Sequence, residues 1–217
     1  MRRIQTIKAT SVILALILTL GIAVGQANAQ HQREINQTIS GSTNFVYRPT
    51  GDEEIRALGI CAGTGTFGSF TCQTLTLIPP GDSPPLGFDT ANCPDRYEFE
   101  LPATAGHVQR FANGQVLYWR RDNSAEAKNF YCVDPSLPTE AYIVQTYEYV
   151  GGSGRFEGAT GKVVMKITND LIHADANGMS AVYGSHGVIK GTINLVGRGH
   201  RTGGTGGDQQ ATSQYPR

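Results

Sequence analysis

The chain has 217 residues, of which 39% are hydrophobic and 17% charged, and its 18 basic residues balance its 18 acidic ones. This length suits one domain with a sizeable core, or two small ones, and the neutral charge excludes nucleic acid as the main partner because no basic stripe is available. Glycine, at 27 residues, exceeds the roughly 7% of average proteins and favours a turn-rich β protein over a helical one.

The first 29 residues have the pattern of a signal peptide. Three basic residues precede an apolar run at 11–25, and Ala27-Asn28-Ala29 matches the small-x-small cleavage pattern. The run is shorter than the ~20 residues of a membrane-spanning helix. We therefore expect cleavage after Ala29 and a secreted or periplasmic chain without a stable membrane anchor, with an uncleaved anchor as the alternative. Cleavage would leave 15 basic and 18 acidic residues.

Four cysteines follow this segment: Cys61, Cys72, Cys93 and Cys132. An even number in an exported chain predicts two disulfides, whereas zinc would need a C-x2-C pair or a nearby histidine at ligand spacing. Three pairings are open, and the local one, Cys61–Cys72 with Cys93–Cys132, is favoured. It requires residues 61–72 to fold back, because one continuous strand would hold the two Cα atoms more than ~30 Å apart.

The rest of the chain is predicted to form strands separated by turns. Residues 30–42 are polar and expected to be loose, and a short apolar run at 44–49 suggests the first strand. Period-two alternation predicts half-buried strands at 73–78 and at 97–101, on either side of a Pro-rich loop at 79–85. Further strands are expected at 107–111, 116–121, 130–133, 141–150, 163–168 and 188–196.

Turn signals support this reading. Asn113-Gly114 predicts a tight hairpin, because both residues tolerate positive φ, and Asn177-Gly178 marks another turn. Beyond the signal peptide, no stretch shows a helical apolar period. Seven or more short strands predict a sandwich or a barrel. Residues 198–217 contain no core formers and are expected to be a disordered tail.

The most distinctive segment is GGSGRFEGATG at 151–161. It resembles the G-G-x-G-x-F-x-G-A-x-G segment of small β-barrel proteins related to allene oxide cyclase and plant dirigent proteins, which many exported bacterial relatives share. Three other pieces resemble that bacterial group in the same order: GTGTFGSFT at 63–71, FANG at 111–114 and Gly191-Thr192-Ile193. Together the resemblance spans about residues 58–196.

The resemblance implies an all-β fold, an antiparallel up-and-down β-barrel of about eight strands with no free edges and room for one small ligand. Characterised relatives act on hydrophobic plant substrates: one cyclises a fatty-acid epoxide, and others steer phenoxy-radical coupling. The polar pocket residues of these relatives are not assigned to positions in this chain, because the matched segments are turns rather than pocket strands. A shared fold also does not imply a shared function. The four cysteines and the Pro-rich loop depart from the family.

We interpret the Gly-rich segment as structural. Phe156 would be an apolar plug of the barrel, and the small residues would allow turns or close backbone passage. These small residues are Gly151, Gly152, Gly154, Gly158, Ala159 and Gly161. The alternative, a phosphate-binding loop, would need a following helix and a closing Lys-Ser/Thr pair, and the sequence has neither.

Candidate chemistry is sparse. The histidines His107, His173, His186 and His200 are isolated and are expected on the surface or in loops. Glu98 and Glu100 share one face of a strand, and that face is expected to be solvated while Tyr97, Phe99 and Leu101 pack inside. His173 lies near Asp170 and Asp175 in the sequence, but one histidine with two acidic residues is common in loops. We therefore predict no metal site and no cofactor.

The strand at 141–150 mixes apolar and polar residues on both faces, as the interior of a ligand-binding barrel would, although an ordinary core or an interface could show the same mixture. One face carries Tyr142, Val144, Thr146 and Glu148, and the other carries Ile143, Gln145, Tyr147 and Tyr149. The single tryptophan, Trp119, alternates with Tyr118 and Arg120. Trp119, Tyr118 and Tyr147 are therefore candidate contacts for an aromatic or lipid-like ligand.

The expected parts are a signal peptide (1–29), a polar segment with the first strand (30–57), a barrel domain (58–197) and the tail (198–217). Our first hypothesis is a non-enzymatic binding or structural module for a small hydrophobic ligand. The second is a cofactor-free cyclase or coupling protein, which needs an ionisable group such as Arg120 or Glu148 inside the cavity. The third is a homo-oligomeric surface protein with a filled barrel and an exposed apolar patch.

Overall fold

The computed structural model describes residues 30–46, 55–79, 84–177 and 180–197. The predicted signal peptide, the predicted tail and Gly178 of the second turn lie outside these residues. Gln30–Val196 forms one compact unit. Among the described residues, no helix has the length and hydropathy that crossing a membrane requires.

The described residues form eleven strands and one short 3-10 helix. The strands are β1 (Gln30–Val46), β2 (Ile55–Gly65), β3 (Phe70–Ile78), β4 (Pro85–Phe88), β5 (Tyr97–Glu100), β6 (Thr104–Phe111), β7 (Val116–Arg121), β8 (Phe130–Asp134), β9 (Leu137–Gly152), β10 (Thr160–Ala174) and β11 (Ser180–Val196). The 3-10 helix, η1 (Gly154–Phe156), lies between β9 and β10.

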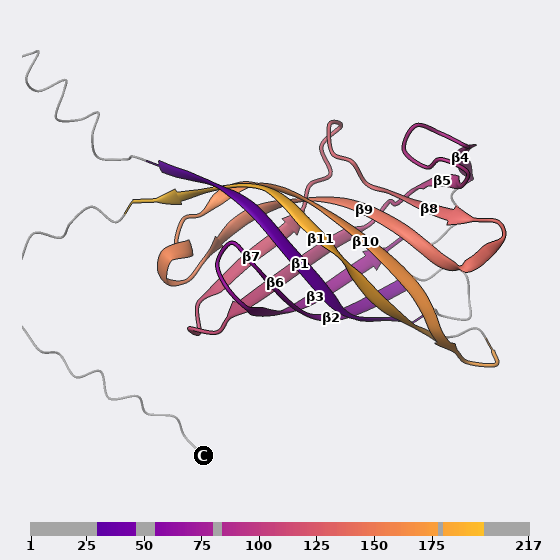
Figure 1. The fold of residues 1–217 in the computed structure, drawn as a ribbon, viewed down its shortest axis with the longest axis horizontal. Helices are drawn as coiled ribbons and strands as arrows, with labels where there is room; N and C mark the ends of the chain where they lie inside the picture. The colour runs from indigo at the N-terminus through magenta and orange to yellow at the C-terminus, as the bar shows by residue number, and fades with distance from the viewer. Residues whose placement is uncertain (1–29, 47–54, 80–83, 178–179, 198–217) are drawn as a thin grey trace, which may run out of the picture. The chain divides into compact units, whose positions relative to one another are not determined.

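Eight of these strands close into an antiparallel barrel, which confirms the predicted fold (Figure 1). Their order around the barrel is β10-β11-β1-β2-β3-β6-β7-β9, and pairing of β9 with β10 completes the circle. β8, β5 and β4 extend from β9 as a side sheet. The Asn113-Gly114 hairpin joins β6 to β7, with Gly114 at φ +80°.

One edge of β9 is shared by two strands. Residues 147–152 pair with β7, whereas residues 137–144 pair with β8. The opposite edge pairs with β10 over residues 140–148. The side sheet therefore branches from the barrel wall where β7 ends.

The expectation that residues 30–42 are loose is wrong, because they belong to β1. This strand pairs with β11 from Gln30↔Val196 to Val46↔Ser180 and with β2 over its second half. Ile35, Gln37 and Ile39 are its buried positions. The polar Gln37 interrupts the apolar alternation that marks a strand. The barrel therefore begins near residue 30, not at 58.

The orientation predicted for β5 is wrong at Tyr97 and Glu98, whereas Leu101 is buried and Glu100 is exposed, as expected. Glu98 is buried, whereas Tyr97 is 39% exposed. The Glu98 carboxylate accepts hydrogen bonds from Thr90 Oγ1 (2.5 Å) and Asn92 Nδ2 (2.9 Å). The loop between β4 and β5 thus supplies polar partners that compensate burial of the charge, and alternation alone could not reveal them.

Both disulfides follow the favoured local pairing. The chain folds back between β2 and β3, so Cys61 and Cys72 are direct cross-strand partners with Cα atoms 4.9 Å apart. Cys93–Cys132 ties the β4–β5 loop to β8, where it forms a small second core with Phe130 and Val144. Two disulfides are typical of an oxidising, extracytoplasmic compartment.

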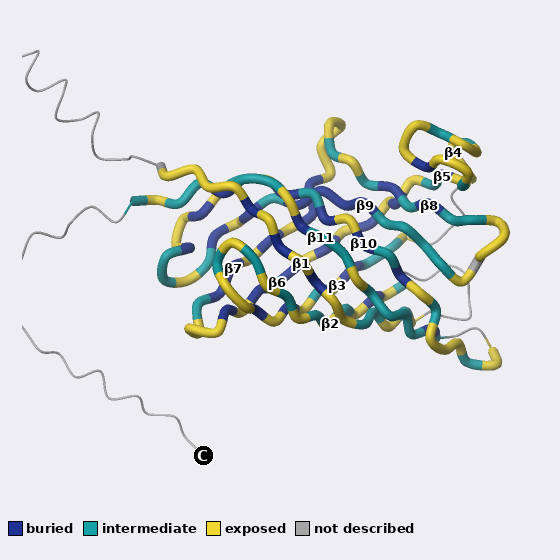
Figure 2. The backbone as a smooth tube through the Cα atoms, viewed as in Figure 1, coloured by how far each residue is buried: buried dark blue, intermediate teal, exposed yellow. Residues whose placement is uncertain are grey.

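Aromatic residues fill the end of the barrel at the β6–β7 hairpin. Phe156 of η1 is fully buried, and its ring centroid lies 5.2 Å from that of Phe67 and 4.9 Å from that of Phe111. The Arg155 guanidinium lies 4.8 Å from the Phe156 centroid. A Cβ at Gly152 would lie 2.8 Å from Phe156 Cβ, so this approach requires glycine. Figure 2 shows buried and exposed positions alternating along the barrel strands.

We expect Phe156→Ala to lower the free energy of unfolding by about 3–5 kcal/mol, because it removes the centre of this aromatic plug. Phe88→Ala is the matched control, since Phe88 is 53% exposed on β4, and it should cost less than about 1.5 kcal/mol. Denaturant unfolding of the mature chain measures both. Equal losses would contradict the assigned role of Phe156.

Candidate functional site

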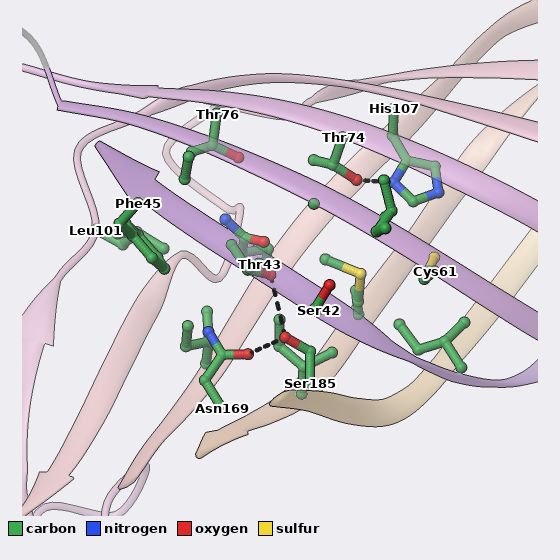
Figure 3. A pocket seen from close by; sticks show the side chains of 18 of the residues that line it. Ser42, Thr43, Phe45, Cys61, Thr74, Thr76, Leu101, His107, Asn169 and Ser185 are labelled. Carbon is green, nitrogen blue, oxygen red and sulfur yellow. Dashed lines mark hydrogen bonds between the residues drawn. The ribbon is translucent and has the colours of Figure 1, made fainter. Parts of the chain in front are cut away.

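A partly open cavity of about 90 Å³ lies inside the barrel, towards the end opposite the aromatic plug. Figure 3 shows side chains that line it. Its apolar wall includes Ile39 of β1, Ile143 of β9, and Met165 and Ile167 of β10. These side chains alternate with outward-facing neighbours, and barrel closure directs them to one space. The cavity is therefore formed mainly by the inward-facing side chains of the strands, rather than by a loop.

A short hydrogen-bonded chain of polar groups lines one side of the cavity. Ser185 Oγ donates to Asn169 Oδ1 over 2.7 Å and is hydrogen-bonded to Thr43 Oγ1 at 3.1 Å. Asn169 is 3% exposed. Asn169 of β10 and Ser185 of β11 are cross-strand partners, and Thr43 comes from β1, which pairs with the other edge of β11. These side chains are hydrogen-bonded to one another and carry no charge, so they make this side of the cavity polar but neutral.

Among the described residues that line the cavity, His107 is the only one with a titratable side chain, because Cys61 is disulfide-bonded. Its Nδ1 is hydrogen-bonded to Thr74 Oγ1 at 2.5 Å, and its ring stacks on Trp119 with centroids 4.3 Å apart. Burial lowers the pKa of His107 from 6.5 to about 3, because desolvation disfavours the charged form. The ring is therefore neutral at pH 7.

The expectation of a surface or loop position for His107 is wrong, since the residue is only 2% exposed. The sequence of β6 contains a pattern from which burial of His107 could have been predicted. Ala105, His107, Gln109 and Phe111 share one face of β6, and all four are buried. The apolar ends of that series indicate an inward face, but the two polar residues between them obscure it.

Between the cavity and the aromatic plug, a belt of buried polar side chains crosses the barrel. We call Gln37, His107, Gln109, Trp119 and Tyr149 the polar belt. Gln109 Nε2 donates to Gln37 Oε1 over 2.9 Å. Each of the five side chains also has one buried polar atom without a hydrogen-bond partner among the described residues. Such groups cost free energy unless water or a ligand satisfies them.

The structure brings together only some of the residues that the sequence suggested. Trp119 and Tyr147 are buried inside the barrel with ring centroids 5.8 Å apart, where Trp119 backs His107. Tyr118 is 45% exposed on the outer face. Arg120 and Glu148 form an ion pair there, with side chains 67% and 31% exposed. Neither ionisable candidate lines the cavity.

One group of metal-type ligands lies inside the barrel. Ligand atoms of Cys61, Cys72 and His107 lie within 4.8 Å of one another. The two sulfur atoms form a disulfide, however, and thiolate is the form of cysteine that binds metal. In this oxidised form the group lacks the ligands of a metal centre. Outside the barrel, His186 lies 3.7 Å from Asp170 on an exposed surface.

A scan against protein-family models finds no match, and a search of curated proteins finds no significant one. Among solved structures, the chain is similar to the pterocarpan synthase dirigent protein, with 12% sequence identity and a TM-score of 0.35. The alignment covers 75% of this chain and 89% of that one. A likeness at this level carries no conclusion about activity.

We expect stability to fall as the pH drops from 6.5 towards 3. The unfolded chain protonates His107 near pH 6.5, whereas burial holds the pKa of the folded state at about 3. Within this window the unfolded state binds more protons, so the free energy of unfolding declines by up to ~1.4 kcal/mol per pH unit.

Denaturant unfolding between pH 7 and pH 4 tests this expectation. His107→Gln should lose this part of the slope, whereas His173→Gln, an exposed control, should keep it. Identical slopes in both variants and the wild type would contradict burial of a neutral His107.

Proposed function

We propose that the chain is an exported, non-enzymatic binding protein that holds one small, largely apolar, hydroxyl-bearing molecule in its cavity. The observation that carries this proposal is an apolar wall next to a buried histidine whose Nε2 atom has no partner among the described residues. An apolar pocket with few convergent polar groups is the usual form of a small-molecule site.

The free nitrogen favours a hydroxyl group on the ligand. If Thr74 donates to Nδ1, then Nε2 carries a proton and needs an acceptor. If Nδ1 donates to Thr74, then Nε2 presents a lone pair and needs a donor. A hydroxyl group serves both cases, because it donates one hydrogen bond and accepts two.

The size of the cavity limits the ligand. At about 90 Å³, it is smaller than a cavity of ~150 Å³ that binds benzene and far below the ~300–1,000 Å³ of drug-sized sites. A short chain or the edge of one ring therefore matches it, and the rest of a larger molecule would need space elsewhere.

Export is part of the proposal. The pattern at 1–29 matches a cleaved signal peptide, and the two disulfides suit an oxidising compartment. Both features favour a periplasmic or secreted site of action.

A cyclase or coupling reaction has less support. Arg120 and Glu148, the candidate ionisable groups, lie on the outer face. Such a reaction would have to use neutral His107 as its base, whereas ligand binding requires no proton transfer. This difference favours the binding role.

We expect Ala57→Leu to weaken 1-butanol binding by about tenfold or more, because Ala57 is 3% exposed and lines the cavity and a leucine would occupy the ligand's space. Ala62→Leu is the matched control, since it places the same change on the exposed face of β2, and it should leave binding unchanged. Ligand-observed NMR with 1-butanol measures both, and native mass spectrometry of protein from its own host identifies a retained molecule.

The hydroxyl contact is tested by comparing 1-butanol with 1-chlorobutane, in which chlorine replaces the hydroxyl group. His107→Phe keeps an aromatic ring on Trp119 and should lower the ratio of 1-butanol to 1-chlorobutane affinity by about 2–10-fold. If wild-type protein bound neither probe, or if Ala62→Leu weakened binding as much as Ala57→Leu, the cavity would not be the binding site.

A second candidate is self-association through the outer face of β2 and β3. Leu58 and Leu75 are cross-strand partners, 55% and 43% exposed, and Ile60 beside them is 61% exposed. We call these three residues the outer apolar patch. Apolar clusters on a surface mark interaction sites, and a second copy of the chain is the proposed partner.

We expect a concentration-dependent oligomer that Leu58→Glu dissociates, because a charge at the centre of an apolar contact is costly to bury. Ile172→Glu is the control, since Ile172 is 67% exposed on β10. Analytical ultracentrifugation distinguishes the species. A wild-type monomer at 100 µM would contradict this candidate without affecting the cavity proposal.

A further inference from the structure

A second feature lies where β7 ends, outside the cavity. Arg121, the last residue of β7, is 5% exposed. Its Nη2 donates to the Leu101 carbonyl oxygen. Its Nε and Nη1 atoms are buried without a hydrogen-bond partner among the described residues. A guanidinium carries five N–H donors and stays charged in proteins, so most of this group's binding capacity is unused.

Among the described residues, no carboxylate forms an ion pair with Arg121. Asp122, the next residue, is bound by Lys162 Nζ over 2.6 Å. Glu100 is exposed and interacts with Arg121 electrostatically, but the two side chains form no ion pair. A buried charge without a partner is strongly unfavourable, so a counter-ion at this position would stabilise the fold.

Arg121 lines an open cleft at this point. The cleft runs between Leu77 at the end of β3, the β5–β6 connection at 100–104 and the β7–β8 connection. Leu77, Leu101 and Pro102 supply apolar surface, and Asn123 supplies an exposed amide. Leu101 lines both the cleft and the cavity, so the two spaces are adjacent.

We propose that Arg121 anchors an anion-binding site in this cleft and that its ligand is a small carboxylate with an apolar body. A carboxylate can accept two parallel hydrogen bonds from one guanidinium, which makes this pair stronger and more directional than a single bond. Leu77, Leu101 and Pro102 contact the apolar body. This site stands independently of the ligand proposed for the cavity.

Benzoate is the probe for this site, and benzamide, its uncharged analogue, is the control ligand. Isothermal titration of the mature, oxidised protein should give benzoate an affinity about tenfold or more above that of benzamide. Arg121→Gln should abolish this difference. Arg110→Gln, which removes an exposed arginine from β6, should retain it.

Two further variants keep the test informative if Arg121→Gln does not fold. Glu100→Gln removes the competing carboxylate and should strengthen benzoate binding about threefold or more. Ala57→Leu, which fills the cavity, should leave benzoate binding unchanged and so separates this site from the proposed cavity site. The side-chain Nε–H resonance of Arg121 should shift on titration.

Three results would overturn the proposal. One is the absence of benzoate binding to wild-type protein. The second is equal affinity for benzoate and benzamide. The third is a Glu100→Gln variant that loses stability without gaining benzoate affinity, because Glu100 would then be the natural counter-ion of Arg121.

Discussion

The pairing of β9 with β10 closes the sheet, and every interior feature depends on its register. Lys162 to Asp170 lie opposite Glu148 to Glu140. Because side chains alternate along a strand, this register directs Gln145 and Tyr147 inward. A slip of one residue would direct Thr146 and Glu148 inward instead. The same strand pairs with both β7 and β8 along its other edge, so it fixes the barrel wall and the side sheet together.

Closure divides the interior into three layers along the barrel. Aromatic rings around Phe156 fill one end, the polar belt crosses the middle, and the cavity occupies the other end. The aromatic layer gains free energy from burial, whereas the polar belt costs free energy wherever a partner is missing. His107 belongs to both the belt and the cavity, so the hydroxyl group of a ligand in the cavity could supply the missing hydrogen bond to its Nε2 atom.

Arg121 occupies a comparable position on the other side of Leu101. It ends β7 at the point where β9 passes from β7 to β8, and the side sheet departs there. A charge is buried at this junction because the wall branches around it, leaving the cleft as its route to a partner. The second proposed site thus lies between the two connections that join the side sheet to the barrel, from β5 to β6 and from β7 to β8.

The sequence by itself determined the β class and the Asn113-Gly114 hairpin, because alternation and turn residues are local features of the chain. It favoured the local disulfide pairing among three, and only the fold decided between them. It missed the polar part of β1, residues 30–42, and misplaced His107, because Gln37 and His107 are polar residues at inward positions and alternation identifies only apolar ones. Trp119 and Arg120 differ by one place in the chain, yet closure places one inside and the other in an outer ion pair. Only the tertiary structure decided which face is interior, since that choice depends on the register between strands far apart in sequence.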